Sequence, residues 1–149
     1  DVGWNSRLDS HQAAFLNLSM DHIEARLKSR RASANIYREK LGNRFPGFTV
    51  ADAPAGYEEN GYCNVCFVDD LAVKVRLEAA LKEKQIGFGN IYPSPLSKQP
   101  GAAAYLKGQA GGDTAAWLCS HVINLPLFPY MTDSEIAEVV DTVSAVLGA

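Results

Sequence analysis

The segment YCNVCFVDD at residues 62–70 decides the fold class of this chain. Its first seven residues are rich in β-branched and aromatic side chains, which favours a buried strand. Asp69 and Asp70 follow, and aspartate is a preferred residue at the N-cap of a helix. Residues 71–84 then carry apolar side chains on one helical face. A strand that leads into an amphipathic helix predicts a domain in which helices pack on a sheet.

The sequence after this segment predicts two more strands and two more helices. The downstream elements are a short strand over 86–92 ended by Pro93 and Pro95, a loop over 97–112, a short helix from Asp113 or Thr114 to about Ser120, a strand over 122–125 closed by Pro126, and a final helix. Proline ends the strands because it cannot donate to the ladder. The final helix begins at the capping box formed by Thr132 and Glu135.

The sequence before the segment predicts two helices and a loop. The first helix, roughly 7–20, opens at Ser6 and Asp9, which resemble a capping box. It is so uniformly apolar that we expect it to be largely buried, against another domain or subunit. The second helix covers roughly 21–42, and residues 43–61 are expected to form a loop with one short strand. Long helices followed by a small sheet with helices on one face predict an α+β fold.

Composition excludes several classes of protein. The chain has 149 residues, the size of one domain, and 47% hydrophobic residues, a globular value. Its 14 basic and 17 acidic side chains give a charge of -3, whereas a nucleic-acid-binding protein usually has a basic excess. No apolar run approaches the roughly 20 residues that span a bilayer. Three cysteines suit a reducing compartment, so we expect a cytoplasmic protein. The first residue is not Met, which suggests a piece of a longer protein.

Cysteines and histidines give no sign of a metal or nucleophile site. Cys63 and Cys66 are three residues apart on one strand, so their thiols should lie on opposite faces, neither bonded together nor sharing a metal. The three histidines, His11, His22 and His121, lack a recognisable nucleophile setting. The basic residues between 26 and 40 are diluted by acidic ones, which is typical of a solvated helix face.

Two short segments are better candidates for binding. Asn5 and Arg7 lie at a predicted helix N-terminus, where free N–H groups and the helix dipole attract anions. An amide and a guanidinium suit phosphate or carboxylate, although a capped helix alone explains the pattern. Tyr92 begins a rigid, proline-containing exit from a predicted strand, a common place for binding side chains.

Four segments in order resemble the DegT/DnrJ/StrS family of nucleotide-sugar aminotransferases, which use pyridoxal phosphate. GWNSRLDSHQAA at 3–14 is similar to the family's G-x-N-x-R-L-x-x-x-Q-A-A segment, and Arg31, Ala34 and Tyr37 resemble its R-x-x-A-x-x-Y helix. IYPSPLSKQ at 91–99 is similar to the H-Y-P-x-P-L-H-x-Q loop, and NLPLFPYMT at 124–132 to the element before the last helix. In place of the loop's two histidines, this chain has Ile91 and Ser97.

The resemblance implies that residues 1–149 are the small C-terminal domain of a type I pyridoxal phosphate aminotransferase fold, with residues 1–20 linking to a large domain. The Schiff-base lysine of the family belongs to that large domain, so the resemblance places no catalytic residue and no metal ligand in this chain. Family members are dimers with sites at the subunit interface. The resemblance assigns Asn5 to the cofactor phosphate of the partner subunit, and Arg7 and Tyr92 to the sugar-nucleotide substrate.

The activity implied is transfer of an amino group from an amino acid, expected to be glutamate, to a nucleotide-linked keto sugar in deoxysugar, polysaccharide or antibiotic biosynthesis. The fragment alone should be inactive. Two alternatives remain open at this point. A sugar 3-dehydratase shares the fold and has a histidine in place of the lysine, and a non-catalytic regulatory protein could have kept the fold. We expect no nucleic-acid partner and no membrane partner.

Overall fold

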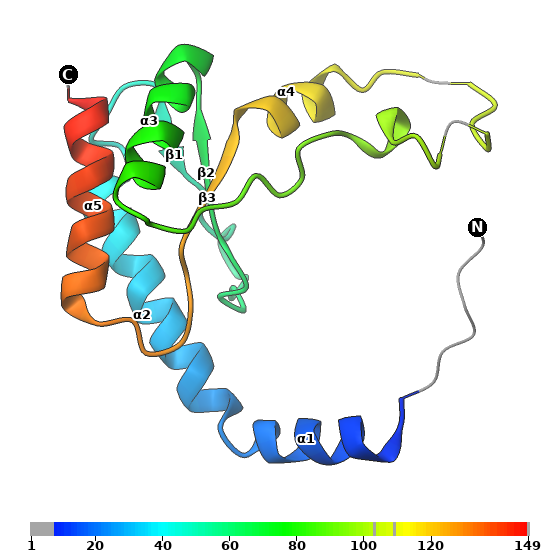
Figure 1. Ribbon diagram of the computed structural model, residues 1–149, viewed down its shortest axis with the longest axis vertical. Coiled ribbons are helices and arrows are strands. Elements are labelled where there is room, and N and C mark those ends of the chain that lie inside the picture. Colours follow the sequence, from blue (N-terminus) through cyan, green and yellow to red (C-terminus); the bar gives the residue numbers. More distant parts are fainter. Residues whose placement is uncertain (1–7, 103, 109, 149) are drawn as a thin grey trace.

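The computed structural model describes residues 8–102, 104–108 and 110–148. Its elements in chain order are α1 (Ser10–Met20), α2 (Ile23–Leu41), β1 (Phe48–Val50), β2 (Asn64–Val68), α3 (Leu71–Glu83), the 3-10 helix η1 (Leu96–Lys98), α4 (Asp113–His121), β3 (Val122–Leu125) and α5 (Asp133–Leu147). The three strands form the body of the molecule together with α2, α3 and α5 (Figure 1). The predicted α+β class, a small sheet after long helices, is confirmed.

The sheet is antiparallel, with β2 between β1 and β3. Cys66 is the Cα partner of Val50 on one side and of Ile123 on the other. Burial alternates along β2, because Asn64, Cys66 and Val68 are buried while the residues between them are half-buried. One face of the sheet therefore meets the core, as the period of two in a strand requires.

The core lies between this face and the three helices α2, α3 and α5. Its buried side chains are Tyr37, Leu41, Phe48, Cys66, Val68, Leu77, Leu81, Ile123, Leu125, Met131, Ile136, Val139 and Val143. The Tyr37 hydroxyl donates to the backbone carbonyl of Pro126 at 3.0 Å, which satisfies a polar group inside the apolar layer. Burial raises the pKa of this phenol, so it stays protonated and keeps donating.

Two helix starts follow the sequence closely. Asp70 caps α3 by accepting from the Ala72 backbone N–H at 2.7 Å. Thr132 and Glu135 form the predicted capping box of α5, in which each side chain bonds the backbone N–H of the other residue. The carboxylate of Glu135 accepts from the Thr132 backbone at 2.8 Å, and this bond lowers its pKa.

The strand predicted over 86–92 is wrong. Gly89 alone pairs with β3, through an isolated bridge to Asn124. The Asn124 side-chain oxygen then accepts the Ile91 backbone N–H at 2.8 Å, in place of a ladder carbonyl. The pairing ends because a side chain takes over the next hydrogen bond, and the chain leaves the sheet.

The first helix begins later than predicted. Asp9 is the N-cap, since its side chain accepts from the Gln12 backbone N–H at 2.8 Å, and α1 starts at Ser10. Ser6 lies outside the described residues. None of the residues of α1 is buried, and Phe15 is 71% exposed. Burial of this helix against another domain or subunit stays a prediction.

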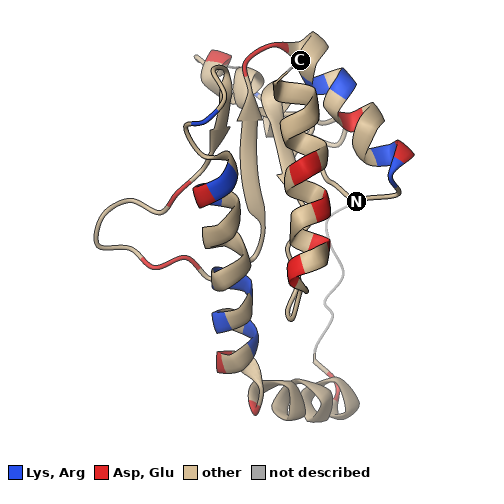
Figure 2. Ribbon diagram, turned by 90° about the vertical axis from the view of Figure 1, so that its left-hand side faces the viewer, with Lys and Arg blue, Asp and Glu red and all other residues tan. Residues whose placement is uncertain are grey.

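Charge is divided between the helices. Figure 2 shows acidic residues along α5 and basic residues along α2, while α1 has neither. Arg31 and Arg38 are not simply solvated. Arg38 pairs with Asp52 at 3.0 Å and with Glu59, and Arg31 donates to the Glu59 backbone carbonyl at 2.7 Å. The basic side chains of α2 therefore hold the loop between β1 and β2. None of the described helices is long and apolar enough to cross a membrane.

Candidate functional site

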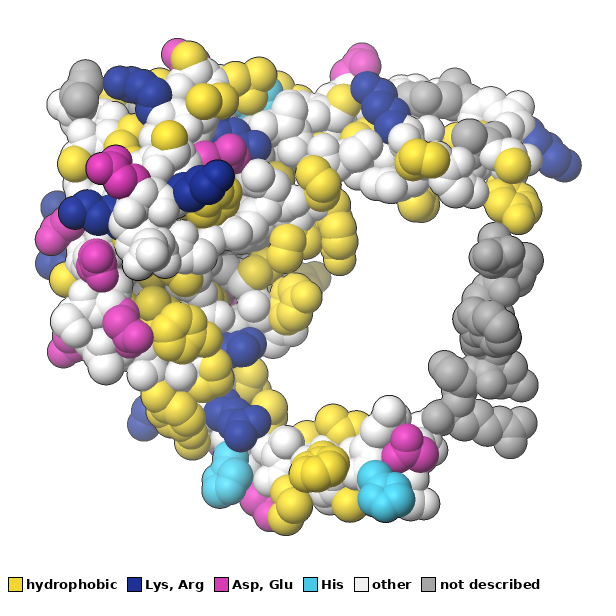
Figure 3. All heavy atoms as spheres, in the orientation of Figure 1, with side chains coloured by type: hydrophobic (Ala, Val, Ile, Leu, Met, Phe, Trp, Pro, Cys, Tyr) yellow, Lys and Arg dark blue, Asp and Glu magenta, His cyan; other side chains and the backbone are white. Residues whose placement is uncertain are grey.

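The described residues between 90 and 112, which we call the arm, extend away from the body and return through α4 (Figure 1). The body, α1 and the arm border an open concavity, and Figure 3 shows hydrophobic side chains on α1 and along the arm. The large exposed hydrophobic residues of these two segments are Phe15, Leu16, Leu18, Met20, Ile91, Tyr92, Leu96, Tyr105 and Leu106. Exposed apolar surface on this scale marks an interaction or binding face.

Tyr92, a predicted substrate residue, lies at the start of the arm and is 72% exposed. It lines two neighbouring pockets, and Cys119 of α4 lines both as well. The smaller pocket, about 120 Å³, reaches the outer face of the sheet at Val65 and Phe67. The larger one, about 470 Å³, is bordered by the beginning of the arm, including Leu96. Tyr92 is thus displayed at a surface that a ligand can reach.

Four side chains that the sequence analysis did not single out fix the base of the arm. They belong to Lys74, Glu78, Asn90 and Asn124. Lys74 is buried on α3, and its Nζ donates to the Ser120 carbonyl at 2.8 Å and lies 3.6 Å from the Glu78 carboxylate. Glu78 in turn accepts from the Asn90 side chain at 3.1 Å. With the bond from Ile91 to Asn124, these contacts join α3, α4, β3 and the arm at one point. The sequence signal that could have revealed this network is Lys74 itself, because the apolar pattern of the helix places it at a buried position.

Stacked aromatic rings from α4 and β2 hold α4 on the sheet. The Trp117 ring stacks with the Phe67 ring of β2, with centroids 6.1 Å apart, and with the His121 ring, with centroids 4.4 Å apart and an interplanar angle of 15°. The Nδ1 atom of His121 is 2.8 Å from the Trp117 carbonyl. His121 is therefore packed and hydrogen-bonded, as expected for a structural histidine.

Cys66 of β2 and Cys63, which precedes that strand, are buried and half-buried thiols. Cys66 faces the core, and burial raises its pKa to about 12. Cys63 lies just before the strand and is half-buried, and burial, followed by the charge of Glu59, raises its pKa. Both are free thiols. The prediction that the two thiols are not bonded to each other is therefore confirmed, although Cys63 lies just outside the strand. Across residues 8–102, 104–108 and 110–148, no group of three or more His, Cys, Asp or Glu side chains is placed to hold a metal ion.

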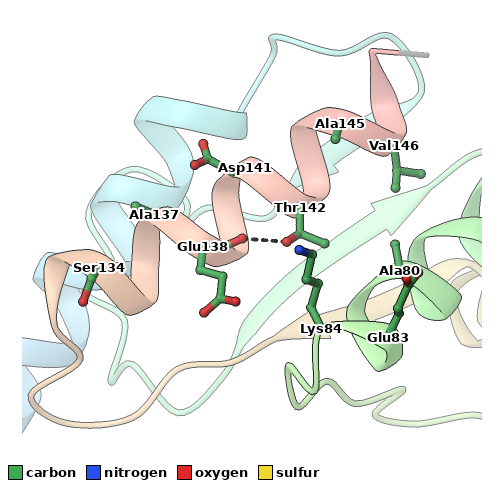
Figure 4. Close-up of a pocket in the computed structure, with 10 residues that line it drawn as sticks. All are labelled: Ala80, Glu83, Lys84, Ser134, Ala137, Glu138, Asp141, Thr142, Ala145 and Val146. Carbon is green, nitrogen blue, oxygen red and sulfur yellow. Dashed lines mark hydrogen bonds between the residues drawn. The ribbon is translucent and has the colours of Figure 1, made fainter.

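Another pocket lies between α3 and α5, on the side of the body away from the arm (Figures 1 and 4). It has a volume of about 650 Å³, and its charged lining consists of Glu83, Lys84, Glu138 and Asp141. Three carboxylates against one ammonium repel a phosphate group. This pocket does not suit a phosphorylated ligand.

Lys74, the buried lysine of α3, is bonded to the Ser120 carbonyl and paired with Glu78, so its ammonium is already engaged. The pockets beside Tyr92 are lined by no charged residue. Asn5 and Arg7, the predicted cofactor and substrate residues, lie outside the described part of the chain.

Residues 1–144 match the DegT/DnrJ/EryC1/StrS aminotransferase family. The chain belongs to this family. Among its curated relatives is the UDP-N-acetyl-3-dehydro-alpha-D-glucosamine 3-aminotransferase of Acidithiobacillus ferrooxidans, 30% identical over 146 residues, or 98% of this chain and 38% of the relative. Another is the pleiotropic regulatory protein of Geobacillus stearothermophilus, also 30% identical, over 96% of this chain and 38% of the relative.

The fold agrees with this membership of the DegT/DnrJ/EryC1/StrS family. The crystal structure of S. venezuelae DesV in complex with a ketimine intermediate superposes with a TM-score of 0.87 at 23% identity, over 99% of this chain and 38% of DesV. The chain thus spans about 38% of the length of these relatives. Its fold is that of one portion of the aminotransferase fold.

Proposed function

We propose that this chain is the C-terminal small domain of a nucleotide-sugar aminotransferase, which moves an amino group from an amino acid, expected to be glutamate, to a nucleotide-linked keto sugar. The observation that carries the proposal is the family match, which runs over residues 1–144 and includes the segment around Tyr92. A relative that is 30% identical over 98% of the chain is a sugar aminotransferase by name. Tyr92 is exposed at the concave face, where a substrate could meet it.

The proposal extends to the cofactor and to the assembly. Members of this family are generally dependent on pyridoxal phosphate, which supplies the chemistry that carries the amino group between two substrates. We propose that Asn5 binds the cofactor phosphate of the partner in a homodimer and that Arg7 and Tyr92 contact the sugar nucleotide. The lysine that holds the cofactor would come from a segment outside these 149 residues, so the chain alone would be inactive. A cytoplasmic location, expected from the few cysteines, also stays a prediction.

The residues of this chain would bind and orient the sugar rather than move its protons. Tyr92 presents an aromatic ring and a hydroxyl, and the network at the base of the arm holds its backbone in place through Ile91 and Asn124. Apolar surfaces on α1 and the arm would pack on the rest of the protein and exclude water. Lys74 would support this arrangement indirectly, because it bonds the Ser120 carbonyl at the end of α4 and pairs with the neighbouring Glu78.

A regulatory role is the second candidate. It is favoured by the relative named as a pleiotropic regulatory protein, which matches over 96% of the chain. It is also consistent with Ile91 and Ser97 at positions where the resemblance places two histidines.

The aminotransferase, the 3-dehydratase that shares its fold and the regulatory protein are separated by the mass of the product. The full-length protein would be incubated with pyridoxal phosphate, glutamate and UDP- or dTDP-linked 3-keto and 4-keto sugars, and the nucleotide sugars analysed by mass spectrometry. An aminotransferase converts a ketone to an amine, whereas a dehydratase removes the elements of water. A regulatory protein leaves every sugar unchanged, and that result would overturn the proposal.

A further inference from the structure

Asn124 is a buried asparagine of β3 that lies on the outer face of the sheet. It is 5% exposed, and its Cα partner on β2 is Val65. Residues directly opposite each other in an antiparallel pair share a face, so Asn124 lies beside Val65, which lines the smaller pocket next to Tyr92. The neighbouring pair, Cys66 and Ile123, belongs to the core on the other face. Asn124 is therefore a polar residue next to the proposed sugar site.

One half of the Asn124 side-chain amide holds the start of the arm. Its Oδ1 atom accepts the Ile91 backbone N–H at 2.8 Å. The backbone N–H of Asn124 donates to the Gly89 carbonyl at 2.6 Å, and its carbonyl accepts the Gly89 N–H at 3.0 Å. Asn124 thus binds the chain at two positions just before Tyr92. Because Tyr92 directly follows Ile91, these bonds set the point at which it leaves the sheet.

The other half of the amide has no partner among the described residues. The Nδ2 atom of Asn124 is buried and makes no hydrogen bond there. The Oδ1 atom of Asn90 is also buried and unpartnered, although the Nδ2 atom of Asn90 donates to Glu78. A buried donor without a partner loses its hydration and destabilises the fold. Leucine, which has a similar branched shape, would avoid that loss, so stability alone does not account for an asparagine at this position.

We propose that Asn124 is a positioning residue of the sugar site, which places Tyr92 through the Ile91 backbone N–H and is kept at a cost in stability. The inference rests on the proposed function and adds a residue to it. Side chains that bind a substrate must be held to within about 0.5 Å of the productive geometry. The Oδ1 acceptor of Asn124 performs this role, whereas its Nδ2 donor only lowers stability.

Two substitutions of Asn124 in the full-length protein separate the two halves of the amide. Asn124→Leu removes both halves, and water can take the freed N–H because Ile91 is 41% exposed. This variant should melt no lower than wild type, while KM for a keto-sugar nucleotide rises about 10-fold and kcat changes less. Asn124→Asp keeps an acceptor but buries a charge, so it should melt lower while its KM stays within about threefold of wild type. A merely structural residue would give the opposite order, with KM following the loss of stability.

Asn64→Leu is the matched control. Asn64 is a buried asparagine of β2, 3% exposed, but it lies on the core face, and its amide is 3.9 Å from Cys66 Sγ rather than on the arm. Its replacement should leave KM within about twofold. Hydrogen exchange followed by mass spectrometry adds a readout that needs no turnover. Exchange at the Ile91 amide should be about 10-fold faster in Asn124→Leu and unchanged in Asn64→Leu.

The outcomes distinguish this inference from the proposed function. A KM that follows the melting temperature across the three variants would overturn the inference and leave the proposed function intact. Equal exchange at Ile91 in Asn124→Leu and wild type would do the same. A wild-type protein that converts no keto sugar would contradict the proposed function, and exchange at Ile91 would then decide by itself whether Asn124 positions the arm.

Discussion

Replacing Lys74 with methionine tests how the arm is held. The substitution keeps the length of the side chain inside α3, so little packing is lost, but it removes the ammonium. The Ser120 carbonyl loses a donor at 2.8 Å, and the Glu78 carboxylate loses a cation at 3.6 Å. Breaking a buried ion pair costs about 3–5 kcal/mol, and Glu78 is 28% exposed, which screens part of that. We expect Lys74→Met to lower the free energy of unfolding by about 2–3 kcal/mol.

Urea unfolding followed by tryptophan fluorescence measures this loss, at a concentration where light scattering reports a monomer. Lys82→Met is the matched control, since Lys82 is exposed on the same helix, and it should change stability by less than about 0.5 kcal/mol. The pairing of Lys74 with Glu78 predicts that Lys74→Met and Glu78→Gln together cost less than the sum of the two single changes. In the full-length protein, Lys74→Met should raise KM for the sugar more than it lowers kcat. Equal stability of Lys74→Met and Lys82→Met would refute the reasoning.

Three further predictions concern other parts of the chain. Hydrogen bonds from Thr132 lower the pKa of Glu135 below its ordinary value of 4.5. Wild type should therefore have a higher melting temperature than Glu135→Gln above that pH, and the difference should disappear as the pH falls below it. A difference that stays constant with pH would contradict the assignment. Asn5→Ala in the full-length protein should weaken pyridoxal phosphate retention by about 10- to 100-fold with little change in melting temperature, since one hydrogen bond to a charged group is lost; unchanged retention in a cofactor titration would remove Asn5 from the site. The 149-residue chain should self-associate through the exposed apolar face of α1, so light scattering that shows a monomer at high concentration would count against that prediction.

The elements that were predicted correctly are marked by contacts between residues close together in the sequence. Asp70, Thr132 and Glu135 mark helix starts because their side chains bond backbone groups within a few residues. The alternation along β2 was also visible, since a strand with one buried face must repeat every two residues. These features depend on neighbours in the chain, and so a single sequence is enough to find them.

The features that the sequence analysis missed depend on contacts between residues far apart in the sequence. Residues 86–92 have the composition of a strand, but the Asn124 side chain takes the Ile91 backbone N–H and ends the pairing. Lys74 and Glu78 have the i,i+4 spacing of a helical ion pair, but their partners Ser120 and Asn90 lie 46 and 12 positions away, and nothing in the spacing identifies those contacts. Tyr92 was predicted at the exit of a strand, but that strand does not form, and Tyr92 lies in the arm three positions after the isolated bridge at Gly89.

The most direct test of the central claim is the effect of Tyr92→Ala on kcat/KM for a keto-sugar nucleotide in the full-length protein. The matched control is Tyr105→Ala, because Tyr105 is equally exposed on the same arm but does not line either pocket beside Tyr92. If the concave face of this chain binds the sugar, Tyr92→Ala lowers kcat/KM by about 10- to 100-fold while Tyr105→Ala leaves it within about twofold. Equal effects of the two substitutions would contradict the claim that this face is the substrate side of a sugar aminotransferase.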